Sequence, residues 1–102
     1  MKKTVSITLD RERQMKLDLN AMSEFEELTG KSLFTIGEDM RQARYIRAML
    51  FCCLKSGKEE ITLEEVGDLI DVENFEYINE RLNILMDKSY GKNEEQIEDK
   101  KK

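Results

Sequence analysis

The spacing of apolar residues changes along the chain and divides it into elements. Near the N-terminus apolar and polar residues alternate, first at Val5, Ile7 and Leu9 and then at Met15, Leu17 and Leu19. A period of two is typical of a half-buried β-strand. The two runs flank Asp10–Arg13 and therefore predict a β-hairpin over 3–19, with one apolar face and a loop of about four residues.

Beyond the hairpin the apolar residues recur at intervals of three and four, which is the spacing of amphipathic helices. Asn20 is placed to cap a first helix that Gly30 ends, and Asp39 is placed to cap a later one. Thr62 and Glu65 fit a capping box, in which each side chain accepts a hydrogen bond from the other residue's backbone amide. These signals predict helices at about 20–29, 33–37, 40–56, 62–71 and 73–89.

The helix predicted at 40–56 is the most apolar of the set. One face carries Ala43, Ile46, Met49, Leu50, Cys53 and Leu54. From Ala48 to Leu54 the remaining circumference is apolar as well, which is typical of a helix buried at the centre of a protein. The expected fold is therefore mainly α, in the α+β class, with the N-terminal hairpin packed on a bundle of four to five helices.

The composition changes at residue 91. The segment 91–102, GKNEEQIEDKKK, has one apolar residue in twelve, too few to offset the entropy lost on ordering. We expect it to be a disordered tail of mixed charge. The 102-residue length and the absence of an internal linker predict one domain over 1–90.

Charge and hydropathy narrow the range of functions. The net charge is −5, and charged residues of both signs make up 38% of the sequence. This balance gives no general attraction to nucleic acid or to anionic membranes. No apolar run approaches the ~20 residues of a membrane span, and Asp10 interrupts the N-terminus before a signal-peptide core could form. We expect a cytoplasmic protein.

Residues that commonly carry catalysis are scarce in this sequence. It has no histidine, and its scattered glycines form no phosphate-binding loop. Cys52 and Cys53 are adjacent in the most apolar helix, where cysteine usually serves as a small core residue. We therefore expect no enzymatic activity, no cofactor and no metal site.

A DNA-binding role is an alternative that the pattern leaves open. The helices predicted at 62–71 and 73–89 resemble a helix-turn-helix, and the protein would then be a small prophage regulator. However, the second of these helices opens with Glu73 and Glu76, whose carboxylates would face phosphate. Arg41, Arg44 and Arg47 form a basic ridge at three-residue spacing, which is a small footprint for DNA.

Two segments carry a resemblance to a known family. Segment 20–34 reads NAMSEFEELTGKSLF, and segment 62–71 reads TLEEVGDLID. In their order and spacing, with the arginine-rich start of an apolar helix between them, they resemble the tail assembly chaperones of long-tailed bacteriophages and gene transfer agents. The resemblance spans about 4–85. At Phe51–Cys53 the family often has a tryptophan or a second small residue instead.

This resemblance implies a non-catalytic role in the host cytoplasm. Members of the family are thought to coat the long hydrophobic tape-measure protein, to keep it soluble and to recruit tail-tube subunits. They are commonly absent from the mature virion. The partners implied for this chain are the tape-measure and tail-tube proteins, without membrane or nucleic acid.

We further predict a partner-binding surface beside the central helix. The number of apolar residues between Leu33 and Leu54 exceeds what one small core needs, so an apolar groove could receive segments of the tape-measure protein. The predicted binding residues are Leu33, Phe34, Ile36, Arg41, Arg44 and Tyr45. Self-association through an exposed strand edge or apolar patch is a second hypothesis.

Overall fold

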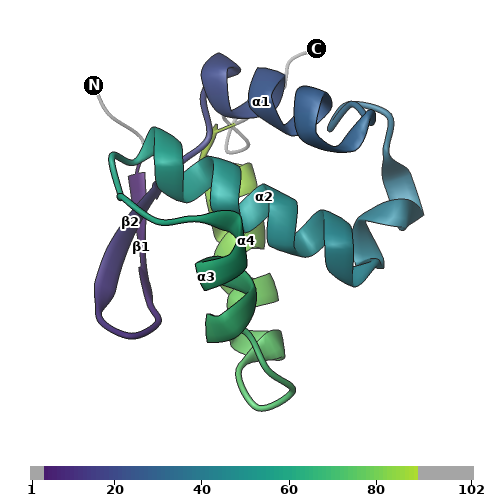
Figure 1. The fold of residues 1–102 in the computed structure, drawn as a ribbon. Helices are drawn as coiled ribbons and strands as arrows, with labels where there is room; N and C mark the ends of the chain where they lie inside the picture. The colour runs from purple at the N-terminus through teal and green to yellow at the C-terminus, as the bar shows by residue number, and fades with distance from the viewer. Residues whose placement is uncertain (1–3, 90–102) are drawn as a thin grey trace, which may run out of the picture.

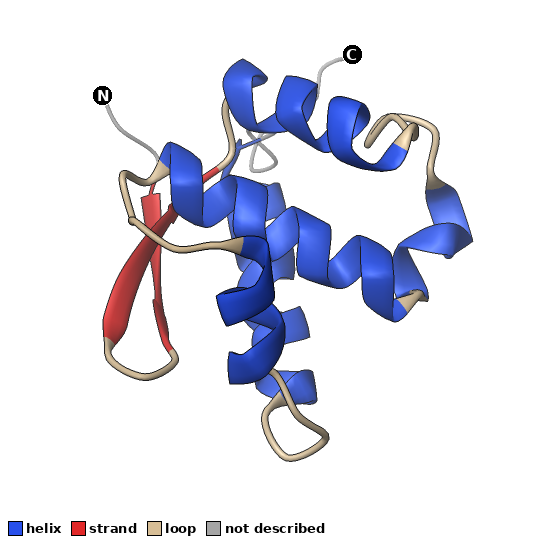
Figure 2. Ribbon diagram, viewed as in Figure 1, coloured by secondary structure: helices blue, strands red, loops and turns tan. Residues whose placement is uncertain are grey.

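A computed structural model describes residues 4–89 of the chain. The described residues form a two-stranded hairpin, four α-helices and one 3₁₀ helix (Figures 1 and 2). In chain order these are β1 (Thr4–Thr8), β2 (Glu12–Lys16), α1 (Leu19–Thr29), η1 (Gly37–Arg41), α2 (Ala43–Ser56), α3 (Leu63–Leu69) and α4 (Phe75–Ser89). The predicted α+β architecture is therefore confirmed. The tail predicted at 91–102 lies outside the described residues.

Helix α2 is the centre of the fold, as its all-round apolar sequence predicts. Its buried side chains are Tyr45, Ile46, Ala48, Met49, Leu50, Cys52, Cys53 and Leu54. Helices α1, α3 and η1 and strand β2 pack against it, while α4 packs on β1. Figure 1 shows α2 running from the η1 turn to the hairpin, with α1 on one side and α3 on the other.

The hairpin has a shorter loop than predicted. Strands β1 and β2 are antiparallel, with Val5 opposite Met15 and Ile7 opposite Arg13. All four of these side chains are buried, so Arg13 occupies a position on the core-facing side of the sheet. The second strand was expected at Met15–Leu19, but the alternation of buried residues starts already at Arg13, and Leu19 is 75% exposed in the first turn of α1.

The N-cap of helix α1 lies two residues before the predicted one. Asp18, rather than Asn20, is the N-cap, and its Oδ1 accepts a hydrogen bond of 3.0 Å from the Ala21 amide. Gly30 ends the helix in the left-handed conformation, at φ 75°, as expected of a glycine in that position. The capping box at α3 is also confirmed: Thr62 Oγ1 accepts from the Glu65 amide, and Glu65 Oε1 accepts from the Thr62 amide.

The prediction of a helix at 33–37 is wrong. Residues 33–35 form a turn, in which the Phe34 amide donates to Ser32 Oγ, and the 3₁₀ helix follows at Gly37–Arg41. Gly37 has φ 58°, which breaks the helical path at that point. Asp39 lies inside η1, and α2 follows an extended Gln42 that makes no side-chain cap, so α2 starts at residue 43 instead of 40.

Candidate functional site

The two thiols are part of the core, as their sequence context predicts. Cys52 and Cys53 are both free and buried. Burial raises the pKa of Cys52 to about 12 and raises the pKa of Cys53 as well, because the thiolate form is poorly solvated there. At neutral pH both groups are therefore protonated and weakly nucleophilic.

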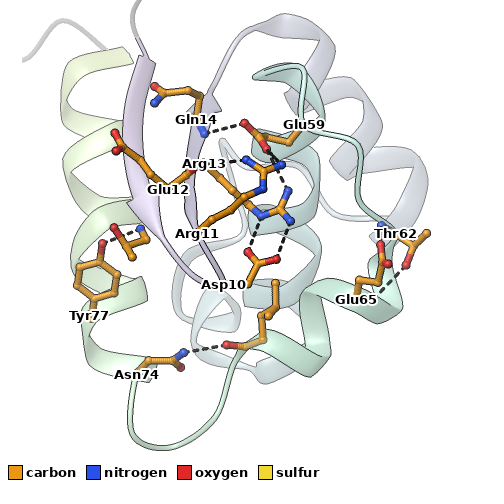
Figure 3. Close-up of polar contacts among 12 residues, drawn as sticks. Asp10, Arg11, Glu12, Arg13, Gln14, Glu59, Thr62, Glu65, Asn74 and Tyr77 are labelled. Atoms are coloured by element: carbon orange, nitrogen blue, oxygen red, sulfur yellow. Dashed lines mark hydrogen bonds and ion pairs between the residues drawn. The ribbon is translucent and has the colours of Figure 1, made fainter.

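An ion cluster around the buried Arg13 side chain ties the hairpin to the segment that follows α2 (Figure 3). The Arg13 guanidinium donates to both carboxylate oxygens of Asp10, at 2.8 and 2.9 Å, and to Glu59 Oε1 at 3.0 Å. The other Glu59 oxygen accepts from the Gln14 amide at 3.1 Å. The hydrogen bond from Arg13 lowers the pKa of Asp10 to about 2. The charged groups of the cluster are hydrogen-bonded to one another, and these bonds hold residue 59 against β2.

A hollow lies between the first half of α2, helix α3 and the start of α4. It is an open pocket of about 700 Å³, which we call the α2–α4 groove. Its apolar lining consists of Ala43, Ile46, Ile70, Val72 and Phe75, together with Gly67. Ile46 is almost fully buried at its base, whereas Val72 is 94% exposed on the loop between α3 and α4.

The loop that forms one wall of the groove is held by side-chain hydrogen bonds. Asp71 Oδ1 accepts from the backbone amides of Glu73 and Asn74, both at 3.0 Å. The Asn74 side chain donates to the Leu69 carbonyl at 2.8 Å and accepts from the Asp71 amide at 2.9 Å. These bonds order the backbone of a loop that leaves Val72 exposed.

A second pocket extends the groove toward η1. It has a volume of about 550 Å³ and shares Ile46 and Phe75 with the first. Met40 and Arg41 of η1 and Asn79 and Asn83 of α4 also line it. The two hollows therefore meet over Ile46 and Phe75.

Two arginines of α2, Arg44 and Arg47, line the groove, with Asp71 as the third charged residue. Arg44 also stacks over the Tyr45 ring, 4.9 Å from its centroid. Both arginines are exposed, and within residues 4–89 neither they nor Arg41 forms a salt bridge. By contrast, Arg11, Arg13, Lys16, Lys31 and Lys55 all pair with carboxylates.

The structure does not gather the six predicted binding residues into one site. Arg44 lines the α2–α4 groove, and Arg41 lines its extension. Tyr45 is buried against Phe25 and borders a further pocket between α1 and α2, which shares Arg44 and Arg47 with the groove. The other three line none of these pockets: Leu33 belongs to the core, Ile36 packs partly against it, and Phe34 is 67% exposed.

The groove residues that the sequence prediction missed come mostly from the second half of the chain. Ile70, Val72 and Phe75 lie in or beside the break between α3 and α4, and Gly67 lies inside α3. A glycine in the middle of a helix is a usable signal, because it weakens the helix unless close packing requires it. The expected basic ridge is also interrupted, because the extended Gln42 separates Arg41 from the helix that carries Arg44 and Arg47.

Comparison with known proteins assigns no family: no family model, no curated protein and no solved structure matches this chain significantly. Within residues 4–89 no helix combines the length and the apolar character needed to cross a bilayer. In the same part of the chain, His, Cys, Asp and Glu side chains form no group of three or more that could hold a metal ion.

Proposed function

We propose that this protein is a non-catalytic tail assembly chaperone of a long-tailed phage or prophage. In this role it binds the tape-measure protein in the host cytoplasm, helps to recruit tail-tube subunits and is absent from the mature virion. The observation that carries the proposal is the α2–α4 groove, an open apolar hollow with the exposed Val72 on its wall. The resemblance of segments 20–34 and 62–71 to the chaperone family supports it from the sequence.

The groove suits a partner that carries apolar helical segments. A helix laid in such a hollow presents apolar side chains at intervals of three and four residues, and burial of each large one contributes about 1.5 to 3 kcal/mol. The tape-measure protein is long and hydrophobic, so it exposes many such segments until the tail tube covers it. A small protein that covers these segments temporarily would prevent their aggregation.

Co-expression with the tape-measure protein tests the proposal. We expect the tape-measure protein to stay in the soluble fraction and to co-purify with this chain. Val72→Asp places a carboxylate on the groove wall and should reduce co-purification, whereas Leu19→Asp on α1 should not. The two residues are 94% and 75% exposed, so neither change disturbs the core.

Phe34→Asp separates the groove from the surface predicted by sequence alone. Phe34 is 67% exposed and lies outside the groove, so the variant should retain the tape-measure protein. Loss of co-purification in Phe34→Asp but not in Val72→Asp would move the binding surface to the α1–η1 segment. A tape-measure protein that aggregates equally with and without this chain would contradict the proposed function.

The geometry does not favour the DNA-binding alternative. Helix α4 would be the recognition helix, but it packs on the hairpin instead. Tyr77 Oη accepts a hydrogen bond of 2.9 Å from the Thr8 amide, and Arg81 donates to the Ser6 carbonyl at 3.0 Å. In a recognition helix, polar side chains of this kind form hydrogen bonds to the edges of the bases, whereas here they bond to the backbone of β1. A gel-shift assay at low salt with the promoter of its own operon is the direct test, and we expect no shift.

A further inference from the structure

The charge around the α2–α4 groove is opposite to the charge of the protein. The chain has 22 acidic and 17 basic residues, so an exposed arginine has carboxylates available to pair with. Arg44 and Arg47 nevertheless face the groove without an ion pair among residues 4–89. Arg41 stands likewise at the extension of the groove.

The positively charged side chains that line the groove come from one helix. Arg44 and Arg47 both belong to α2, three residues apart, and therefore lie on the same face of that helix. The other side is formed by Ile70, Val72 and Phe75. Asp71 adds one carboxylate on this side, and its Oδ1 already accepts two backbone amides. A ligand thus meets a cationic edge along α2 and a largely apolar edge along the α3–α4 loop.

We infer that the α2–α4 groove takes an amphipathic helix whose apolar stripe is bordered on one side by carboxylates. The apolar stripe occupies the hollow over Ile46 and Phe75, and Asp or Glu side chains reach Arg44 and Arg47. An arginine guanidinium suits this role because it can hold a carboxylate with two parallel hydrogen bonds. This inference rests on the proposed function, since it names the chemistry of the segments that such a chaperone would select.

Two designed peptides test the inference directly. Both have about 18 residues, or five helical turns, and carry the same leucine stripe. One has glutamate and the other lysine at the positions bordering the stripe on one side. Fluorescence anisotropy of the labelled peptides gives their affinities for the full chain. The net charge of −5 by itself favours the lysine peptide, so a preference for the glutamate peptide must come from the local arginines.

We expect the glutamate peptide to bind at least about fivefold more tightly than the lysine peptide, the scale of two partly exposed ion pairs. Raising the NaCl concentration from about 0.1 to 1 M shortens the Debye length from about 10 to 3 Å and should remove most of this difference. The double variant Arg44→Glu/Arg47→Glu should reverse the preference. Lys88→Glu, a matched reversal of an exposed charge at the other end of α4, should leave it unchanged.

Equal binding of the two peptides would overturn the inference. So would a glutamate preference that survives the double reversal in a variant that circular dichroism shows to be folded. Binding of a DNA duplex by the unmodified protein, if lost in the same double variant, would show that the arginines contact phosphate. That result would also overturn the inference.

The outcome is separable from that of the proposed function. If the tape-measure protein co-purifies but the two peptides bind equally, the chaperone role stands and the charge rule fails. If the glutamate peptide is preferred but the tape-measure protein is not retained, the groove chemistry stands and its assigned partner is wrong.

Discussion

Arg47 of α2 lies across Gly67 of α3: a Cβ atom added to Gly67 would stand 3.2 Å from Cδ of Arg47. The absence of a side chain at residue 67 thus lets the arginine stem pass over α3 on its way along the groove. Glycine inside a helix costs about 0.5 to 1 kcal/mol relative to alanine. Gly67 therefore makes α3 less stable but leaves room for the side chain of Arg47.

We predict that Gly67→Ala stabilises the protein by about 0.5 to 1 kcal/mol, because the only close neighbour is a flexible side chain that can shift. Gly57→Ala should have the opposite sign and cost about 1 to 3 kcal/mol, because a Cβ there would overlap the backbone carbonyl of Gln14 in β2. Urea unfolding of both variants measures the effects. Destabilisation by Gly67→Ala would show that Arg47 cannot move.

Arg13→Met should lower the free energy of unfolding by about 2 kcal/mol, because it removes the shorter of the two ion pairs of Glu59, at 3.0 Å, where the carboxylate is only 12% exposed. Arg11→Met is the matched control. Arg11 also reaches Glu59, at 3.3 Å, but its side chain is 61% exposed, so its loss should cost less than about 1 kcal/mol. Equal costs for the two variants would show that burial of Arg13 adds nothing.

Acid should weaken the fold partly through Asp10. The Arg13 hydrogen bond lowers the pKa of Asp10 from the ordinary 3.8 to about 2 in the folded state. The unfolded chain therefore takes up this proton first as the pH falls. The contribution of Asp10 is complete above about pH 4 and disappears between there and about pH 2.

The measurement is the dependence of unfolding free energy on pH in Asp10→Asn. Its slope should be shallower than that of the unmodified protein over this acid window. Glu12→Gln, an exposed change in the same hairpin, provides the comparison. An unchanged slope in Asp10→Asn would mean that the Arg13 contact does not discriminate between the two protonation states.

Asp18→Ala should cost about 1 to 2 kcal/mol, because Asp18 caps α1 and also accepts a hydrogen bond of 2.7 Å from the Ser56 hydroxyl at the end of α2. Asn20→Ala should change stability by less than about 0.5 kcal/mol, because Asn20 is exposed inside the first turn. Thermal unfolding followed by circular dichroism compares the two. If Asn20→Ala were the more costly change, the cap would be at residue 20.

Local patterns predicted most of the fold. The all-round apolar character of Ala48–Leu54 identified the central helix, because a helix with no polar face must be covered on all sides. Thr62 with Glu65 and the left-handed Gly30 marked helix ends correctly, because capping depends on residues only a few positions apart. Between these signals the segment 33–41 was misread, because short turns and 3₁₀ helices lack a distinctive apolar period.

The order of apolar and polar residues was enough to locate most helices and to identify α2 as the core of the protein. The burial of Arg13 between Asp10 and Glu59 depends on the three-dimensional fold, since residues 13 and 59 meet only when the segment after α2 packs on β2. The three-dimensional fold also determines where apolar surface stays uncovered. Ile46 of α2 and Phe75 of α4 line the same groove. The spacing of apolar residues predicts which face of each helix is apolar, but it does not predict which neighbouring element covers that face.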